Sequence, residues 1–479
     1  MSHTRARHLV SFIAAAGLSG CMVGPNYHRP DLIAPPAFKE AQGWTPAVPA
    51  DSLDRGDWWS LFGDPVLDGL ERRVEINNQN LKAAAAAYDQ ARALVAEDRS
   101  ALFPTVNLTG AGTHSGANSG AARSAGTGAG NGGATSGDTY QAALGASWAP
   151  DLWGKLRRTI EGAKANAQAT EADLANARLS AQSEVAADYT QLRLADANTA
   201  LLQKTVDAYT RTLKITQNQY AQGVAAQSDV LAATSQLDSA QASLVNQETS
   251  RQQAEHAIAL LVGVAPADLT IAVQPDWTPR PPPTPEALPS TLLQRRPDVA
   301  AAERAAASAS AQIGVQVAGY FPDLTLSASY GFASSTLGSL FNSSNALWSY
   351  GGNVAQTVFN AGLTSAQVRA AKATYAEDVA NYRQTALTAF QQVEDALVAA
   401  KVLQNEEAYT RAASVAADRV ETITVNQYQA GTVAYTSVVT AQATALAARE
   451  ALLNLQGQRI TTSITLIEAL GGGWNGTLK

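Results

Sequence analysis

The sequence repeats one plan twice, and each copy combines two short strand-like segments with one very long helix. Residues 218–223, NQYAQG, recur as residues 426–431, NQYQAG, and residues 102–108, LFPTVNL, match residues 320–326, YFPDLTL. A repeat period of roughly 200 residues indicates a duplicated unit, because solenoids are built from much shorter repeats. The two halves are therefore expected to fold alike.

Proline marks the boundary between the halves. Residues 281–283 are three consecutive prolines within the stretch 275–289. Because proline fixes φ and lacks a backbone N–H, this stretch is expected to be an extended linker. The predicted segments are a signal peptide (1–20), an N-terminal anchor segment (21–65), a first repeat (66–272), a linker (273–290), a second repeat (291–470) and a C-terminal tail (471–479).

Helical patterns fill most of each half. A helix of about 30 residues precedes the strand-like segments, and a helix of nearly 70 residues, roughly 100 Å long, follows them. A heptad runs from Val185 to Tyr220, which predicts coiled-coil packing against neighbouring helices. Both long helices end at Tyr-x-x-Gly, where glycine permits a tight turn into a return helix. The predicted helices cover residues 66–101, 152–220 and 228–262 in the first half, and residues 290–319, 363–428 and 436–470 in the second.

Two segments in each half alternate apolar with polar side chains, which predicts strands. A tilted strand crosses an outer membrane with about 9–11 residues, and each segment is close to this length. The predicted strands cover residues 106–109, 140–148, 324–332 and 348–355. The residues expected to face a water-filled lumen are Gln141, Ser147, Ser327 and Asn353, and those expected in an aromatic girdle are Tyr140, Trp148, Tyr330 and Trp348.

The number of strands constrains the assembly. Four strands are too few to close a transmembrane barrel, which needs about eight, and lipid does not tolerate an open sheet edge. Several copies must therefore share one barrel, and three copies would supply 12 strands. The predicted fold class is mainly α with a membrane β-barrel, in which a trimer continues the barrel as a long periplasmic α-helical coiled coil. A soluble four-stranded sheet with one face in water explains the alternation equally well on its own.

The first residues distinguish these two interpretations. Arg5 and Arg7 precede the apolar run 9–18, which is too short for a membrane span of about 20 residues and is typical of a secretory signal. The sequence LSGC ending at Cys21 resembles a bacterial lipobox, in which the cysteine is acylated and becomes the mature N-terminus. Met22, in place of Asp, resembles the outer-membrane sorting pattern. An ordinary signal peptide beside a chance cysteine is the alternative, and lipidation favours the membrane interpretation.

Several longer motifs carry a family resemblance. They are residues 21–30, CMVGPNYHRP; residues 58–65, WWSLFGDP; residues 295–299, RRPDV; and residues 319–322, GYFP. Together they resemble the outer-membrane factor (TolC-like) family of tripartite efflux systems, specifically its NodT-type lipoprotein branch. Asn26 stands where many relatives carry Asp, a change that we expect to be harmless.

The resemblance implies a homotrimer in the cell outer membrane that extends into the periplasm as a passive exit duct for small molecules. Its implied partners are a periplasmic adaptor protein and an inner-membrane efflux pump, and the NodT-type branch favours a proton-driven pump. Cys21 would carry a covalent lipid, and no other cofactor is expected. The alternative function is a periplasmic coiled-coil lipoprotein that acts as a spacer and has no pore.

Two kinds of site follow. The resemblance implies tip-to-tip docking of the adaptor on the helix turns, although the glycines there are also needed simply to make the turn. The gate candidates are charged residues near the tips, because symmetry copies of one carboxylate around an axis would form a cation-favouring ring. The docking candidates are Gly223, Val224, Gly431 and Thr432, and the gate candidates are Asp418, Arg419, Glu421, Asp207 and Arg211.

Composition excludes other classes of function. With 34 basic and 41 acidic residues the chain is mildly acidic, whereas a nucleic-acid partner requires a concentrated basic face. Residues 128–133, GAGNGG, satisfy a dinucleotide-binding pattern but lie in the Gly/Ser-rich run 110–137, which is expected to be an external loop. The five histidines are scattered and Cys21 is the single cysteine, so no metal site is predicted. No catalytic constellation is present, and the chain is predicted not to be an enzyme.

Overall fold

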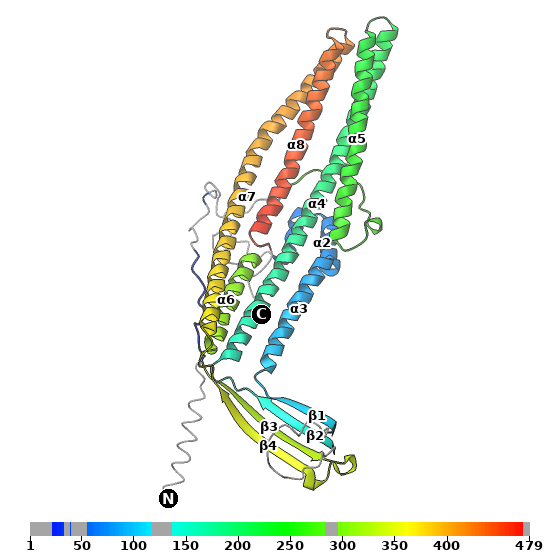
Figure 1. Ribbon diagram of the computed structural model, residues 1–479. Helices are drawn as coiled ribbons and strands as arrows, with labels where there is room; N and C mark the ends of the chain where they lie inside the picture. The colour runs from blue at the N-terminus through cyan, green and yellow to red at the C-terminus, as the bar shows by residue number, and fades with distance from the viewer. Residues whose placement is uncertain (1–21, 33–38, 40–54, 117–136, 283–295, 473–479) are drawn as a thin grey trace. The chain divides into compact units, whose positions relative to one another are not determined.

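The computed structural model describes residues 22–32, 39, 55–116, 137–282 and 296–472 (Figure 1). Cys21, the predicted signal peptide and the motif at 128–133 lie outside the described residues. The chain forms two compact units, each assembled from three stretches of sequence. The first unit comprises Met1–Arg29, Gln90–Ala167 and Arg304–Val379, and the second comprises Pro30–Asp89, Gln168–Glu303 and Ala380–Lys479.

Long helices dominate the described chain. Helices α4 and α7 each have 67 residues, close to the predicted bounds, and are rich in residues of high helix propensity such as Ala, Gln and Leu. None of the described helices is long and apolar enough to cross a membrane. The α-helices are α2 (Pro65–Asn77), α3 (Gln79–Ser100), α4 (Lys155–Ala221), α5 (Gln227–Leu261), α6 (Pro297–Ala318), α7 (Leu363–Gln429) and α8 (Tyr435–Ala469), with short 3-10 helices such as η2 (Arg55–Phe62) between them.

The prediction of one continuous helix over residues 66–101 was wrong, because Asn78 interrupts it. The backbone of Asn78 is extended, with ψ of 123°, and ends α2. Its side-chain oxygen accepts hydrogen bonds from the N–H groups of Asn80 and Leu81, at 2.9 and 3.1 Å, and so caps α3. Its Nδ2 donates to the carbonyl of Leu261 at 2.8 Å. One asparagine therefore serves as the end of one helix and the N-cap of the next.

The first unit contains a four-stranded antiparallel sheet in the order β1-β2-β3-β4 (Figure 1). The pairing register places Leu144 opposite both Leu108 and Tyr330, and Tyr330 opposite Trp348, so these side chains share one face. The strands are β1 (Thr105–Ser115), β2 (Gly137–Trp148), β3 (Asp323–Ser334) and β4 (Ala346–Ala355).

The two faces of this sheet differ sharply in polarity. One face carries all four predicted girdle aromatics, and its apolar side chains are exposed: Leu108 is 80% exposed, Trp348 70% and Tyr350 79%. The other face carries the four predicted lumen residues, and only Leu347 among the residues of β4 interrupts its polar or small character. Among the described residues, the ring of Phe341 contacts Phe332 on this face, but most of the apolar face remains uncovered. The polar residues are Gln141, Ser147, Ser327 and Asn353, and the aromatics are Tyr140, Trp148, Tyr330 and Trp348.

The assignment of residues 110–137 to a loop was wrong at its beginning, because residues up to Ser115 belong to β1. Glycine weakens a strand, and Gly110 and Gly112 concealed the alternation. A Cβ at Gly112 would lie only 3.4 Å from the ring of Tyr140, which covers this position from the neighbouring strand. An aromatic side chain on β2 therefore compensates for a missing side chain on β1.

The second unit contains α5, α8, the larger parts of α4 and α7, and several apolar clusters. The largest cluster joins η2, α2, α4, α5 and α8, with Trp59, Val74, Val185, Ile258 and Ile464 among its buried members. The predicted heptad holds along α4 from Val185, which is fully buried, to Val206. It fails at Tyr220, which is 47% exposed at the end of the helix.

Candidate functional site

The two helix turns have the same backbone geometry. Gly223 and Gly431 adopt positive φ of 76° and 72°, a region that favours glycine. The N–H of Val224 donates to the carbonyl of Gln219 at 2.8 Å, and the N–H of Thr432 donates to the carbonyl of Gln427 at 2.9 Å. All four docking candidates are exposed, Val224 by 69%. The turns at the ends of α4–α5 and α7–α8 (Figure 1) thus present small or apolar groups to solvent.

The two tips differ in how their tyrosines pack. Tyr220 is exposed, whereas its counterpart Tyr428 is only 6% exposed. The hydroxyl of Tyr428 donates to Oγ1 of Thr216 on α4 at 3.3 Å, and its ring lies 5.3 Å from the ring of Tyr435. Burial raises the pKa of Tyr435 to about 12. This tip cluster, Tyr428 and Tyr435 with Ala233 and Val438, connects the two hairpins and was not identified from sequence. The sequence does differ between the tips at this point: Tyr435 stands where the first tip has Gln227. This difference could have indicated the cluster.

Asp418 and Glu421 of α7 share one cation from α8. Nε of Arg449 donates to Asp418 Oδ1 at 2.8 Å, and Nη2 donates to Glu421 Oε2 at 2.6 Å. Although burial lowers the pKa of the Arg449 guanidinium, Glu421 and Asp418 together raise it above its ordinary value. The two candidate carboxylates therefore share one cation within the chain, Arg449, which the sequence prediction missed.

The other gate candidates do not join this group. Arg419 is exposed and borders a shallow depression beside Val415 and Ile423. Asp207 is exposed and accepts a hydrogen bond from Gln203 one turn away, at 3.2 Å. Arg211 is exposed as well, and among the described residues it has no ion pair. No described ion pair brings the candidates of the first half onto those of the second.

A second charged cluster joins α7 to α8 farther from the tips. Glu407 accepts hydrogen bonds from Arg459, from Gln456 at 2.9 Å and from Arg411 at 2.5 Å. Burial acts to raise the pKa of Glu407, but the hydrogen bonds from Gln456, Arg411 and Arg459 outweigh it and lower this pKa. Two separate carboxylate–arginine contacts thus hold the α7–α8 hairpin together along its length.

A buried ionic clasp ties the start of the linker to α4 and α5. The carboxylate of Asp196, fully buried, accepts from Arg193 at 2.9 Å, from Arg251 at 2.8 Å and from the backbone N–H of Gln274 at 3.0 Å. Arg193 also donates to the carbonyl of Ala272 at 2.8 Å. Every charge in this ionic clasp therefore has a partner, as burial requires.

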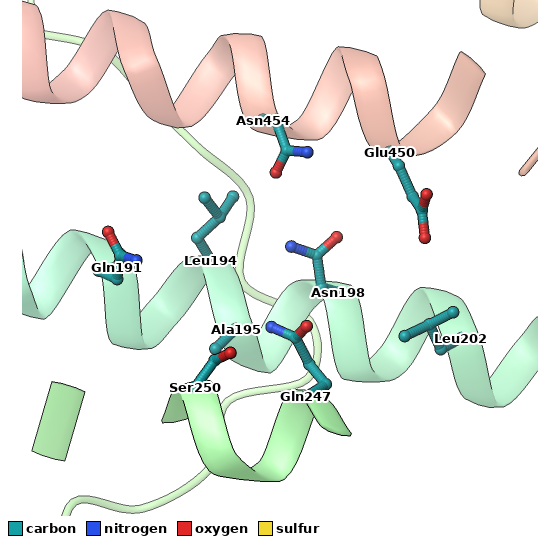
Figure 2. A pocket seen from close by; sticks show the side chains of 9 residues that line it. All are labelled: Gln191, Leu194, Ala195, Asn198, Leu202, Gln247, Ser250, Glu450 and Asn454. Atoms are coloured by element: carbon teal, nitrogen blue, oxygen red, sulfur yellow. The ribbon is translucent and has the colours of Figure 1, made fainter. Parts of the chain in front are cut away.

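A polar cavity of about 350 Å³ lies between α4, α5 and α8 of the second unit (Figure 2). Figure 2 shows Asn198, Gln247, Asn454 and Glu450 around this space. Burial raises the pKa of Glu450. Carboxamides from three helices around one carboxylate make a cavity suited to water.

A family model described as "Outer membrane efflux protein" matches residues 71–264 and 288–472. The chain belongs to the outer membrane efflux protein family.

Relatives match this family member over almost its full length. Cation efflux system protein CusC of Escherichia coli O6:H1 is 30% identical over 476 residues, covering 97% of this chain and 98% of that protein. Pyoverdine export outer membrane protein OpmQ of Pseudomonas aeruginosa is 31% identical over 467 residues, covering 97% of both. The solved outer-membrane channel OprN superposes with a TM-score of 0.85 at 28% identity, covering 95% of this chain and 100% of that one.

Membership confirms the predicted fold class, function and location. The efflux protein is an outer-membrane channel of a tripartite efflux system, and its helical part extends into the periplasm. Its solved relatives are trimeric channels, among them CusC with a TM-score of 0.83 at 26% identity, covering 94% of this chain and 100% of that one. The family is one of efflux channels, which are not enzymes. The docking, gate and lipid-attachment residues stay predictions.

Proposed function

We propose that three copies of this efflux protein form one passive conduit, which receives small molecules from an inner-membrane pump through a periplasmic adaptor. The observation that carries this proposal is the two-faced sheet of the first unit. Its exposed apolar face, with Leu108, Trp348 and Tyr350, suits lipid, and its polar face suits water. A periplasmic spacer without a pore would expose this apolar face to water, and such a face is therefore not expected in it.

The sheet edges account for the number of chains. Within the described residues, β1 and β4 each pair along one side only. An unpaired N–H or C=O group costs several kcal/mol in hydrocarbon, so β4 of one copy is expected to pair with β1 of the next. Three copies give 12 strands, within the range of known outer-membrane barrels. The polar residues Gln141, Ser147, Ser327 and Asn353 would then line the lumen.

The helix tips are the proposed adaptor site. Gly223 and Gly431 fix the turn shape, and the exposed Val224 and Thr432 offer a small apolar and a small polar contact. A partner helix hairpin can approach such residues closely. Cysteines at Val224 and Thr432 should crosslink to the adaptor in live cells, and the absence of any crosslinked adaptor would contradict this assignment.

The gate is proposed to lie where α7 contacts α8 and α4 near the tips. Arg449 holds Asp418 and Glu421, and the tip cluster holds α7 to the neighbouring hairpin. Opening the pore requires these helices to move apart, so each contact stabilises the closed form.

Acylation of Cys21 is proposed as the anchor of the mature N-terminus. Stable attachment needs more than one acyl chain, which lipoprotein modification would provide. The cargo is not specified by this architecture: the names of the relatives refer to cations, pyoverdine and toluene.

Conductance across planar bilayers tests the conduit. The purified protein should give stepwise currents, whereas the spacer alternative gives none. Two neighbouring substitutions provide a matched comparison. Ser327→Arg on the polar face should lower the single-channel conductance, and Leu326→Arg on the apolar face should instead prevent insertion into the bilayer. Equal effects of the two substitutions would contradict the assignment of faces.

A further inference from the structure

The first described residues of the chain lie against the beginning of α4 and the end of α6, all within the first unit. The N–H of Val23 donates to the carbonyl of Trp153 at 3.0 Å. Farther along, the guanidinium of Arg304 lies 5.7 Å from the centre of the Tyr27 ring. Residues 22–27 are thus held at both ends.

Arg158 of α4 makes most of the contacts with this segment. Its side chain is only 1% exposed, and it donates to the carbonyls of Val23 and Gly24 at 3.2 and 3.3 Å and to Oδ1 of Asn26 at 2.9 Å. Its remaining Nη1 donates to Glu161 at 2.7 Å. A buried guanidinium is costly unless its donors are satisfied. The N-terminal segment therefore supplies acceptors that Arg158 requires.

Glycines allow the segment to approach closely. Gly24 has φ of +92°, and a Cβ there would lie 2.5 Å from Cα of Gly314. A Cβ on Gly314 would lie 2.8 Å from Cγ of Arg158, and a Cβ on Gly154 would lie 2.6 Å from Met22. No side chain fits at these three positions. We call residues 22–27 together with Trp153, Arg158 and Gly314 the N-terminal dock.

The N-terminal dock lies where the strands meet the helices. The indole N–H of Trp153 donates to the carbonyl of Pro322 at 2.8 Å, and β3 begins at the next residue. The Trp153 ring stacks on Phe321 with centroids 4.8 Å apart. β2 ends at Trp148, five residues before Trp153. Trp153 therefore contacts both the N-terminal segment and the base of the sheet.

We propose that the N-terminal dock sets the depth of the lipid anchor, with Arg158 as its positioning residue. This proposal rests on the proposed acylation of Cys21. Cys21 directly precedes Met22 in the sequence, and Met22 lies against Gly154. Acyl chains on residue 21 would enter the leaflet beside the helix-side ends of the strands. The lipid and the sheet then hold the chain at the same depth, and the partner of this surface is the inner leaflet of the outer membrane.

Hydrogen–deuterium exchange at Val23–Tyr27 in lipid nanodiscs tests the N-terminal dock directly. Arg158→Ala should accelerate exchange there by at least about tenfold, since hydrogen bonds to a charged group are lost. Gly24→Ala should do the same by obstructing the approach to Gly314. Lys164→Ala is the matched control, because Lys164 is an exposed cation on the same helix, and it should leave exchange unchanged. Wild-type exchange in Arg158→Ala would overturn the N-terminal dock.

A double-mutant comparison tests whether Arg158 acts through the lipid. Membrane insertion of the full chain is followed in wild type and in Cys21→Ser exported with a non-lipoprotein signal peptide. Arg158→Ala should slow insertion of the acylated chain several-fold and have no further effect in the Cys21→Ser chain. An equal effect in both backgrounds would show a merely structural role and overturn the proposal. The intact mass of the wild type reports separately on acylation: a mass without acyl groups would refute the lipid anchor, whatever the exchange data show.

Discussion

Nε of Arg449 on α8 donates to Oδ1 of Asp418 on α7 across 2.8 Å, and the same guanidinium reaches Glu421. This contact joins the two helices of one hairpin near its tip. Both carboxylates were expected to line a gate, and within one chain this single cation offsets about half of their combined charge. If they line the gate as proposed, the position of Arg449 determines how much of their negative charge the pore meets.

Arg449→Ala is expected to favour the open pore. The substitution leaves two neighbouring carboxylates without their cation, and a half-buried ion pair of this kind contributes about 1 kcal/mol, so the open-to-closed ratio should rise roughly fivefold. Open probability in planar bilayers measures this ratio. Lys372→Ala is the control, since Lys372 is an exposed cation on α7 that is not a gate candidate, and its currents should match those of the wild type. Unchanged gating in Arg449→Ala would remove this contact from the gate.

Glu71 is predicted to make the helical part less stable at alkaline pH. Its side chain is fully buried, and its carboxylate oxygens have no hydrogen-bond partner in the part of the chain that the structure describes. Burial, together with Glu75 and Asp68, raises its pKa to about 9. The folded pKa lies above the unfolded value of 4.5, so folding favours the neutral acid. The cost is absent below the unfolded pKa and increases as pH rises toward the folded one. Glu71→Gln should therefore raise Tm on the order of 5 °C at pH 8 and change it little at pH 4.

Thermal unfolding followed by circular dichroism at both pH values measures this difference. Glu97→Gln is the control, because Glu97 is an exposed glutamate on α3. A stabilisation of Glu71→Gln that is equal at pH 4 and pH 8 would show that packing, and not the carboxyl proton, is responsible.

The prediction from sequence succeeded where the signal is local. Tyr-x-x-Gly specifies its own turn, because glycine alone accepts the positive φ at Gly223 and Gly431. The alternation along β2 and β3 was visible because every second side chain is apolar. Asn78 was missed although asparagine is a common N-cap, since the helical pattern continues on both sides of it.

The contacts of the candidate site could not be predicted in the same way. Arg449 lies 31 residues from Asp418, and the sequence contains no sign of which faces of α7 and α8 meet. Arg419 was the cation nearest in sequence, but Asp418 and Glu421 form their ion pairs with Arg449 instead. The close approach of Gly24 to Gly314, beside Arg158, could not be predicted either, because only the fold brings these residues together.

Tyr435→Ala is expected to loosen the second tip. Tyr435 is 3% exposed in the tip cluster, and truncating a buried aromatic side chain costs about 3 kcal/mol because it leaves a cavity. Hydrogen exchange in the peptides that cover Tyr428 and Val438 should accelerate by roughly a hundredfold. Gln227→Ala, at the equivalent place in the first tip, should have little effect. Similar exchange in the two variants would mean that the second tip is not specially stabilised.

Asp196→Asn is expected to release the start of the linker from α4 and α5. Asp196 is fully buried and compensates both Arg193 and Arg251. Its neutralisation leaves the buried Arg193 without a carboxylate partner, a loss of about 3–5 kcal/mol, whereas Arg251 keeps Glu255. The N–H of Gln274 also loses a charged acceptor. Limited proteolysis within residues 271–280 should become faster, and Tm should fall.

Asp207→Asn is a matched control on the same helix, because Asp207 is exposed and has only a hydrogen bond from Gln203. If both variants resist protease equally, the linker is held by its apolar contacts, such as the burial of Ile271, and the ionic clasp is dispensable.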